Sequence, residues 1–384
     1  RALGPPLKKI GTPPKKAGRS PRPPPDPFNP PPAGDRPADL ATLTLPDGRS
    51  LPYIVRVESG TLNRTIYRIA MLDDGSAPEG PAWRPGGAWT RRLAVLSGGA
   101  LAGRPPPAPP PPPMILNNLY LSRGFAVMNA SGLVNGLASN AVIQGETLMM
   151  MKEHFIERYG VPRWTVGTGG SGGAIQQIHI TALYPGLLDG IQAQSSFADS
   201  QVATHVLDCD LMQNYWKKAN KTSWTDEKKA AAAGYASATT CDLWTRFIAP
   251  GLKVKEKAAC GLTDLALVYD PKTNPTGARC GIYNWMANQL GRDPKTGFPL
   301  SPLDNVGVQY GLAALNAGQI SVDEFLDLNA EIGGYTADGE YSPERTAASP
   351  ATMKRLYASG LVNPGAGGLA TTPVILYRSY GDPQ

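Results

Sequence analysis

The alternation of apolar and polar residues predicts how the chain begins to fold. An alternating pattern is typical of half-buried strands, and it predicts strands over Leu40–Leu45, Leu51–Glu58 and Arg64–Leu72. Apolar runs predict two further strands, at Arg92–Leu96 and Gly124–Asn129. Because tight turns join the first three segments, we expect these opening strands to pair antiparallel.

Helical periodicity appears in the middle of the chain and alternates with short strands. Apolar residues at helical spacing predict helices over residues 141–159 and Gly172–Leu183. Strands are predicted on either side of the second helix, at Trp164–Val166 and Leu188–Ala193. Strands that alternate with helices predict crossover connections and parallel pairing. The predicted fold class is therefore α/β, with a mostly parallel central sheet and antiparallel opening strands.

Regions with different patterns predict the domain organisation. Residues 1–39 are basic and rich in proline, which is typical of an extended, disordered tail. Residues 40–196 carry the strand–helix alternation of the core. Residues 197–368 are mainly helical and contain all the cysteines, so we expect a cap, or lid, inserted into the core. Strand signal returns at Pro373–Tyr380, which makes residues 369–384 a late core strand.

Positive charge is concentrated at the start of the chain. The net charge is +6, and residues 1–39 hold eight basic side chains against three acidic ones. No aromatic residue stands between the lysines of this segment, so it lacks the stacking groups of many nucleic-acid-binding proteins. The chain also has no run of about 18 apolar residues, as a membrane-spanning helix needs. We therefore expect neither a nucleic-acid partner nor a membrane partner.

The four cysteines all lie in the predicted cap, at Cys209, Cys241, Cys260 and Cys280. They form no C-x-x-C pair, so no zinc site is predicted. An even number of clustered cysteines favours two disulfides, which are typical of oxidising compartments. Three pairings are possible, of which neighbour pairing, Cys209 with Cys241 and Cys260 with Cys280, is favoured. Four buried free thiols in a cytosolic protein are the alternative.

The segment around Ser171 has the most informative chemical signature. Gly169, Ser171 and Gly173 form a G-x-S-x-G motif that follows a predicted strand and opens a predicted helix. In this context the motif is typical of a nucleophile elbow, a sharp turn that raises a serine Oγ above a sheet. The N–H group of Gly172, at the start of the helix, would face the oxyanion that develops during acyl transfer.

The same glycines allow a second interpretation. Gly167, Gly169 and Gly172 satisfy G-x-G-x-x-G, the pattern of a dinucleotide-binding loop. That loop needs an acidic residue at the end of the next strand, whereas Asp189 lies at the start of its predicted strand. No lysine follows the glycines, which argues against a Walker loop. A glycine-rich turn without chemistry is a third interpretation, and the elbow is favoured.

Further catalytic groups are predicted at the ends of neighbouring strands. Gly98 and Gly99 follow an apolar run and are candidates for the second oxyanion donor. Asp199 and Asp382 each follow a predicted strand, where a carboxylate that orients the base is expected.

The chain contains three histidines, and His205 is the candidate base because it follows the strand after the motif. His154 lies on the preceding helix, and His179 lies eight residues past Ser171, which is about 12 Å along a helix. No histidine follows His205, although histidine comes last in the usual order of the triad. The sequence therefore predicts either His205 as base or a histidine beyond Gln384.

Several segments resemble known hydrolases. The elbow, together with Gln176, Tyr184-Pro185 and Leu188–Ala193, resembles that of tannase and fungal feruloyl esterases. A longer resemblance, from about residue 40 to the end, is to a mostly bacterial family of secreted serine-hydrolase-like proteins. It is carried by Leu45–Gly48, Arg56–Arg64, Lys152–Gly160, Gly169–Gln177, Asp208–Leu211, Asn274–Cys280, Asp304–Leu312, Leu328–Gly334 and Tyr377–Asp382.

This resemblance implies an α/β-hydrolase fold with a disulfide-bearing cap, export from the cell, and Ser171 as nucleophile. Cys209 and Cys280 fall at positions where that family also has cysteines. The family continues past its counterpart of Asp382 with a stretch that contains histidine. The chain departs from the family at residues 1–39 and in the proline run 104–113, where aromatic and Gly/Cys-rich sequence would be expected.

The sequence as a whole predicts a secreted or periplasmic serine esterase that works through an acyl-enzyme, without a metal or an organic cofactor. Its substrate would be a small-molecule or polymeric ester, and the oligomeric state is left open. Two alternatives are a non-catalytic or truncated binding protein of the same fold and a dinucleotide-binding enzyme. A histidine within about 3.2 Å of Ser171 Oγ would favour an esterase over a non-catalytic binding protein. Binding of a nucleotide would favour the dinucleotide-binding enzyme.

Overall fold

The structure is a computed structural model of the chain. It describes residues 8–10, 39–76, 83–99, 115–196, 204–218, 220–247, 249–254, 260, 262, 264–363 and 365–378. For residues 8–10, 204–206 and 247 it describes the backbone alone.

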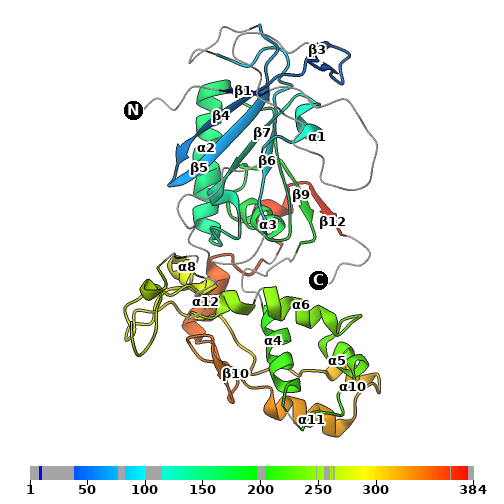
Figure 1. The fold of residues 1–384 in the computed structure, drawn as a ribbon, viewed down its shortest axis with the longest axis vertical. Helices are drawn as coiled ribbons and strands as arrows, with labels where there is room; N and C mark the ends of the chain where they lie inside the picture. The colour runs from blue at the N-terminus through cyan, green and yellow to red at the C-terminus, as the bar shows by residue number, and fades with distance from the viewer. Residues whose placement is uncertain are drawn as a thin grey trace.

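An eight-stranded sheet forms the core, in the spatial order β1-β4-β5-β7-β6-β8-β9-β12 (Figure 1). The strands from β1 to β7 in this order pair antiparallel, and those from β7 to β12 pair parallel. This mixed sheet confirms the predicted α/β class with its antiparallel opening. The strands are β1 (Lys8–Ile10), β4 (Val55–Leu62), β5 (Thr65–Leu72), β7 (Phe125–Ala130), β6 (Arg92–Leu96), β8 (Trp164–Gly170), β9 (Gly190–Gln194) and β12 (Val374–Tyr377).

Both faces of the sheet are buried, and the period of two along each strand explains how. On β5, Tyr67, Ile69 and Met71 pack into the cluster that includes residues of α2 (Ala141–Tyr159) and α3 (Gly172–Leu183). Ala70 and Leu72 of the same strand point to the opposite face, where α1 (Asn118–Leu121) and the hairpin β2 (Thr42–Thr44) to β3 (Ser50–Pro52) cover it. A short turn of helix, η1 (Ser131–Leu133), follows β7.

Two differences from the sequence prediction concern the opening strands. The segment predicted as one strand, Leu51–Glu58, is two strands, because the chain bends at Tyr53 and Ile54 and the N–H of Ile54 donates to the carbonyl of Pro52. The tail predicted to be unstructured contributes β1, whose residues Lys8–Ile10 pair with Val55–Val57 of β4. A short segment of basic and apolar residues gives no pattern that distinguishes an edge strand from a tail.

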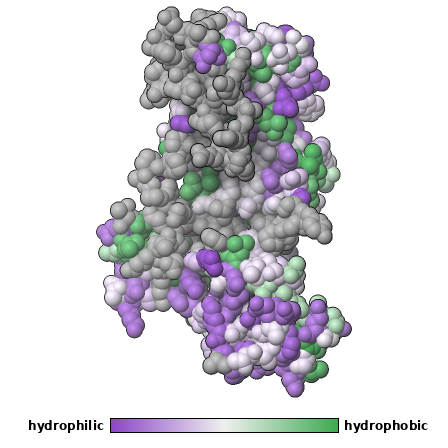
Figure 2. All heavy atoms as spheres, turned by 45° about the vertical axis from the view of Figure 1, so that its right-hand side comes forward, coloured by the Kyte–Doolittle hydropathy of each residue, from purple (hydrophilic) through white to green (hydrophobic). Residues whose placement is uncertain are grey.

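A second apolar cluster is formed mainly by residues 207–361, in the region predicted to be a cap, and we keep that name for it. In Figure 1 this region lies beyond one end of the sheet. Its largest helix is α4 (Thr204–Trp216), whose Leu211 and Tyr215 are buried in that cluster. Figure 2 shows mostly hydrophilic side chains on the visible face of the cap. Its other elements are α5 (Asp226–Ala233), α6 (Thr239–Phe247), η3 (Ala249–Leu252), η4 (Leu265–Leu267), α8 (Ile282–Trp285), α9 (Ala287–Leu290), α10 (Leu312–Asn316), α11 (Val322–Glu331), β10 (Gly334–Tyr335), β11 (Tyr341–Ser342), α12 (Pro350–Ala358) and η5 (Gly367–Ala370).

Two disulfides cross-link the cap. Cys209 on α4 is bonded to Cys241 on α6, and Cys260 is bonded to Cys280. This is the neighbour pairing that the sequence favours, and it leaves no free cysteine.

Polar and apolar contacts join the cap to the core beside the elbow. The side-chain amide of Asn140, the N-cap of α2, donates to the carbonyl of Trp285 and to Asn288 Oδ1, both at 2.6 Å. Ile175 of α3 belongs to the apolar cluster of the cap. The cap is therefore fixed next to the helix that begins at the motif. Across the described part of the chain, no helix is long and apolar enough to span a membrane.

Candidate active site

Ser171 lies in a sharp turn between β8 and α3, as the motif predicts. Its backbone has φ 54° and ψ −123°, a left-handed conformation that residues other than glycine rarely adopt. Its N–H donates to the carbonyl of Gln194 on β9 at 2.9 Å, and its carbonyl accepts the N–H groups of Ala174 and Ile175. A backbone held in this region costs about 1–3 kcal/mol, so the surrounding contacts must enforce it. The residue is partly exposed rather than buried.

The glycines of the motif are required by the neighbouring strand. A Cβ at Gly173 would lie 2.5 Å from the carbonyl oxygen of Ser97, which follows β6, and a Cβ at Gly169 would collide with the same oxygen. Gly169 also has φ 157°. The loop after β6 therefore packs directly against both sides of the turn, and side chains at these positions would push it away.

The same loop places a second backbone donor near Ser171. A Cβ at Gly99 would lie 3.8 Å from the Cβ of Ser171 and 3.1 Å from the carbonyl oxygen of Gly170. The N–H of Gly98 already donates to the carbonyl of Leu133 at 2.9 Å. Of the two predicted glycines, Gly98 is thus occupied, and Gly99 is the one whose N–H has no acceptor among the described residues.

The N–H of Gly172 is the other candidate donor. Gly172 is the first residue of α3, where backbone N–H groups have no acceptor within the helix. The positive end of the helix dipole favours negative charge at this point. Gly172 and Gly99 lie on either side of Ser171 in the fold, one after β8 and the other after β6.

Two of the three histidines, His179 and His154, have surroundings that do not include Ser171. His179 is completely buried on α3, and burial lowers its pKa to about 4 despite the influence of the Leu361 backbone. His154 Nε2, in the C-terminal half of α2, lies 2.6 Å from Glu58 Oε1 and 3.1 Å from the Tyr67 hydroxyl. Neither contacts Ser171, which agrees with the interpretation from the sequence.

The remaining predicted catalytic residues are placed only in part. His205 lies in the first turn of α4, with its backbone described and its side chain not. Asp199 and Asp382 lie outside the described residues. These three therefore stay predictions. Within the described residues there is no cluster of three histidine, cysteine, aspartate or glutamate side chains that could hold a metal ion.

The contacts around the glycines bear on the nucleotide interpretation. A Cβ at Gly167 would meet the side chains of Leu188 and Gln177 at 3.0 and 3.2 Å, so protein atoms already fill the space beside it. Asp189 precedes β9 and accepts the N–H of Thr165 through Oδ2 at 2.7 Å. A dinucleotide loop needs open backbone and a carboxylate at the other end of the strand. Neither feature is present at these residues.

Comparison with known families decides the relationship. Residues 24–384 match the family described as the tannase-like family of unknown function (DUF6351). The chain belongs to this family. The predicted resemblance to tannase-like hydrolases is therefore confirmed. No curated protein matches the chain.

Three solved structures that are similar to this tannase-like chain have low sequence identity to it. An esterase from Aspergillus oryzae has 13% sequence identity and a TM-score of 0.40, with 89% of this chain and 69% of that chain covered. Feruloyl esterase B from Aspergillus oryzae has 11% identity and a TM-score of 0.37, with 90% and 69% covered. Oligopeptidase B from Leishmania major has 15% identity and a TM-score of 0.24, with 43% and 21% covered.

One residue of the site was not singled out from the sequence. The buried side chain of Gln177 donates through Nε2 to the carbonyl of Gly169 at 3.2 Å and to that of Gly173 at 2.9 Å. These carbonyls lie on the two sides of Ser171, so one amide connects the strand before the turn with the helix after it. Its spacing, one helical turn past Gly173, was the available signal. A buried polar residue on a helix has many other possible roles.

Proposed function

We propose that this tannase-like protein is a serine esterase that hydrolyses carboxylic esters through an acyl-enzyme at Ser171. The observation that supports this most is the backbone of Ser171, held in a left-handed conformation at the start of a helix. Strained backbone of this kind clusters at active sites, and here it coincides with the serine of the G-x-S-x-G motif. Ser171 is also partly exposed, which is compatible with the role of a nucleophile.

The proposed reaction has two steps. Ser171 Oγ attacks the carbonyl carbon of the ester while its proton passes to the base, for which His205 is our candidate. The N–H groups of Gly172 and Gly99 stabilise the oxyanion, and Asp199 or Asp382 orients the base. The C–O bond then breaks, and the leaving alcohol takes the proton. Water, deprotonated by the same base, attacks the acyl-enzyme and releases the acid.

The substrate class and location follow the same proposal. The ester would be a small molecule or part of a polymer, held between the elbow and the cap. The two disulfides of the cap are typical of oxidising compartments, so we propose a secreted or periplasmic protein.

A fluorophosphonate label tests the nucleophile, because it reacts with activated serines. We expect the wild-type chain to be labelled on the peptide that contains Ser171, and Ser171→Ala to remove the label. Ser131 is the control serine, since it is buried at the start of η1 and its Oγ accepts the N–H of Ile66: Ser131→Ala should leave labelling unchanged. Labelling of a folded wild-type protein at any other serine would reject the proposal.

The base needs its own experiment. We expect His205→Ala to lower the rate of labelling by about 100-fold or more, and His154→Ala to leave it within about twofold. Equal labelling rates for wild type and His205→Ala would reject His205 while leaving Ser171 in place.

A further inference from the structure

The cap contains a cavity that the proposed ester hydrolysis does not explain. Its volume is about 290 Å³, which is close to the lower limit of small-molecule sites. It lies against α4, which contributes Leu207, Asp208 and Leu211 to its wall. Apolar and polar residues both line it, and they are Leu207, Asp208, Leu211, Leu303, Asp304, Asn305, Val308, Tyr335 and Thr346. We call this space the α4 cavity.

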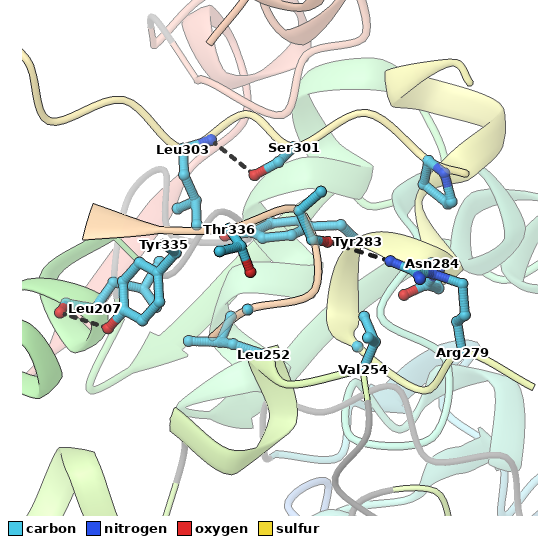
Figure 3. A pocket seen from close by; sticks show the side chains of 14 residues that line it. Leu207, Leu252, Val254, Arg279, Tyr283, Asn284, Ser301, Leu303, Tyr335 and Thr336 are labelled. Atoms are coloured by element: carbon cyan, nitrogen blue, oxygen red, sulfur yellow. Dashed lines mark hydrogen bonds between the residues drawn. The ribbon is translucent and has the colours of Figure 1, made fainter. Parts of the chain in front are cut away.

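A smaller cavity adjoins it across a shared wall. The second space has a volume of about 20 Å³, too small for an organic molecule. Figure 3 shows Leu207, Leu303 and Tyr335, which line both cavities, and the Tyr335 hydroxyl directed at the backbone of Leu207. That hydroxyl donates to the Leu207 carbonyl and to Asp210 Oδ2, at 3.1 and 2.9 Å. The shared wall is thus held in place and its polar atom is used.

Most other polar groups of the α4 cavity are also used within the protein. Asp304 accepts the N–H groups of Val306 and Ala348 with its two carboxylate oxygens. The amide of Asn305 donates to Tyr310 and Gly333, and its oxygen accepts the N–H of Thr346. These groups shape the cavity and leave little hydrogen-bonding capacity for a ligand.

Thr346 is used in the same way. Its hydroxyl accepts the N–H of Tyr335 at 2.7 Å and lies 3.3 Å from the Tyr335 carbonyl. Its side chain therefore contributes shape rather than a free donor to the cavity.

Asp208 is different, because half of its carboxylate is uncommitted. Oδ1 accepts the hydroxyl of Tyr310 at 2.6 Å, while Oδ2 has no partner among the described residues. The one available polar atom of the cavity is therefore an acceptor, and a ligand must supply a donor. Leu207, Leu211, Leu303 and Val308 provide the apolar surface for the rest of such a ligand.

Charge decides which kind of donor fits. Asp208 and Asp304 give the cavity two carboxylates. Arg345 lies close enough to influence Asp208, but its guanidinium donates to the carbonyls of Asn305, Val308 and Asn329. Three tyrosines also lie close enough to interact electrostatically with Asp208, and none of them carries a positive charge: Tyr235, Tyr310 and Tyr335. A cation would be favoured, and an anion would meet like charge.

Burial of Asp208 also favours a cationic ligand. Burial raises the pKa of its carboxyl, although the Tyr310 hydroxyl and Arg345 partly oppose this. A partly buried carboxylate that is in no ion pair with the described residues gains most from a ligand that carries a cation.

We propose that the α4 cavity binds a primary ammonium group carried on a small apolar body. The ammonium lies at Asp208 Oδ2, and the apolar body packs between Leu211, Leu303 and Val308. Ser171 does not line this cavity, and the proposal does not depend on the esterase reaction.

Three probes of similar size test the proposal by calorimetry on the whole chain at pH 7. Benzylammonium should bind at least about tenfold more tightly than benzyl alcohol, because its hydrogen bond to Asp208 is charge-assisted, and benzoate should not bind. Equal binding of the ammonium and the alcohol would reject the charge recognition, and failure of benzylammonium to bind would reject the site.

Variants then place the binding. Asp208→Asn keeps an acceptor for Tyr310 and should remove the preference for benzylammonium, whereas Glu157→Gln, on an exposed position of α2, removes the same charge and should change nothing. Val308→Trp fills the cavity without a change of charge and should abolish binding. Binding that persists in both Asp208→Asn and Val308→Trp would overturn the proposal.

Discussion

The elbow around Ser171 and the cap below it are held in shape by different kinds of contact. At the elbow, the strained turn is enforced by its own glycines, by Gln177 one helical turn away, and by the adjoining ends of β6 and β9. In the cap, the decisive hydrogen bonds join residues far apart in sequence. Tyr310 and Asp208 are separated by 102 positions, and Tyr335 and Asp210 by 125.

This difference explains which region tolerates change. A turn whose glycines contact a backbone carbonyl has no freedom to adjust, so single atoms matter there. The cap distributes its stability over two disulfides and many side-chain contacts, so loss of one should weaken it without destroying its fold. The following predictions test this contrast, beginning with the largest effect.

A side chain at Gly173 should have the largest effect on the elbow. Gly173→Val places atoms where the Ser97 carbonyl lies 2.5 Å from a Cβ, so we expect a loss of about 4 kcal/mol or more in unfolding free energy. Labelling of Ser171 should disappear. Gly307→Val is the matched control, since nothing lies within 4 Å of its Cβ. Urea unfolding measures the stability of both variants. Equal urea midpoints for Gly173→Val and Gly307→Val would contradict the tight packing of the elbow.

Loss of a disulfide should affect the cap more than the elbow. Cys209 and Cys241 are 32 positions apart, for which the loss of chain entropy in the unfolded state corresponds to about 3–4 kcal/mol. We expect Cys209→Ala with Cys241→Ala to lower the urea midpoint but to leave fluorophosphonate labelling of the folded protein intact. Removing the 20-residue link, Cys260 to Cys280, should cost slightly less. Loss of labelling in a folded double variant would show that the cap shapes the elbow.

The core also contains a carboxylate that makes its stability depend on pH. Burial alone would raise the pKa of Glu58, but hydrogen bonds with His154, Tyr159 and Tyr67 lower it from 4.5 to about 2. The resulting stability is fully present above pH 4.5 and is lost as the pH falls towards 2, with a total of about 3 kcal/mol. The free energy of unfolding, measured between pH 4.5 and pH 2, should fall with falling pH in the wild type. The part of this slope that Glu58 causes should be missing in Glu58→Gln. An unchanged slope in the variant would assign it to other groups.

The smallest stability effect is expected at Gln177, with a clear effect on reactivity. Gln177→Leu removes the two hydrogen bonds that span the turn, which should cost about 2 kcal/mol and slow labelling of Ser171 by about 10- to 100-fold. The neighbouring Gln176 is equally buried, but its amide has no partner among the described residues. Gln176→Leu should therefore leave the labelling rate unchanged. Equal rates for both variants would reject Gln177 as a positioning residue.

The contrast also shows which features of the structure can be predicted from the sequence. Two helices and one strand have the bounds that their patterns predict: residues 141–159, residues 172–183 and Arg92–Leu96. The helix bounds are marked by local signals, since Asn140 begins the first helix, Gly160 ends it, and a turn follows Leu183. The elbow follows from its glycines and its place between a strand and a helix. The occupied N–H of Gly98 depends on Leu133, which is distant in sequence, so no local pattern predicts it.

The cap was harder to predict, for the same reason. Its helical character and the disulfide pairing were accessible from cysteine spacing and periodicity. The α4 cavity forms where α4 meets residues 303–308, Tyr335 and Thr346, and no sequence period links these segments. Likewise, β1 is recognised by its pairing with β4 rather than by its own sequence.

The most direct test of the account is to trap the acyl-enzyme. The whole chain is mixed with p-nitrophenyl acetate, quenched with acid within milliseconds and digested for mass spectrometry. We expect an acetyl group on the Ser171 peptide in wild type and none in Ser171→Ala. An acetyl group on another residue of the folded wild-type protein, or ester hydrolysis that Ser171→Ala retains in full, would contradict the central claim.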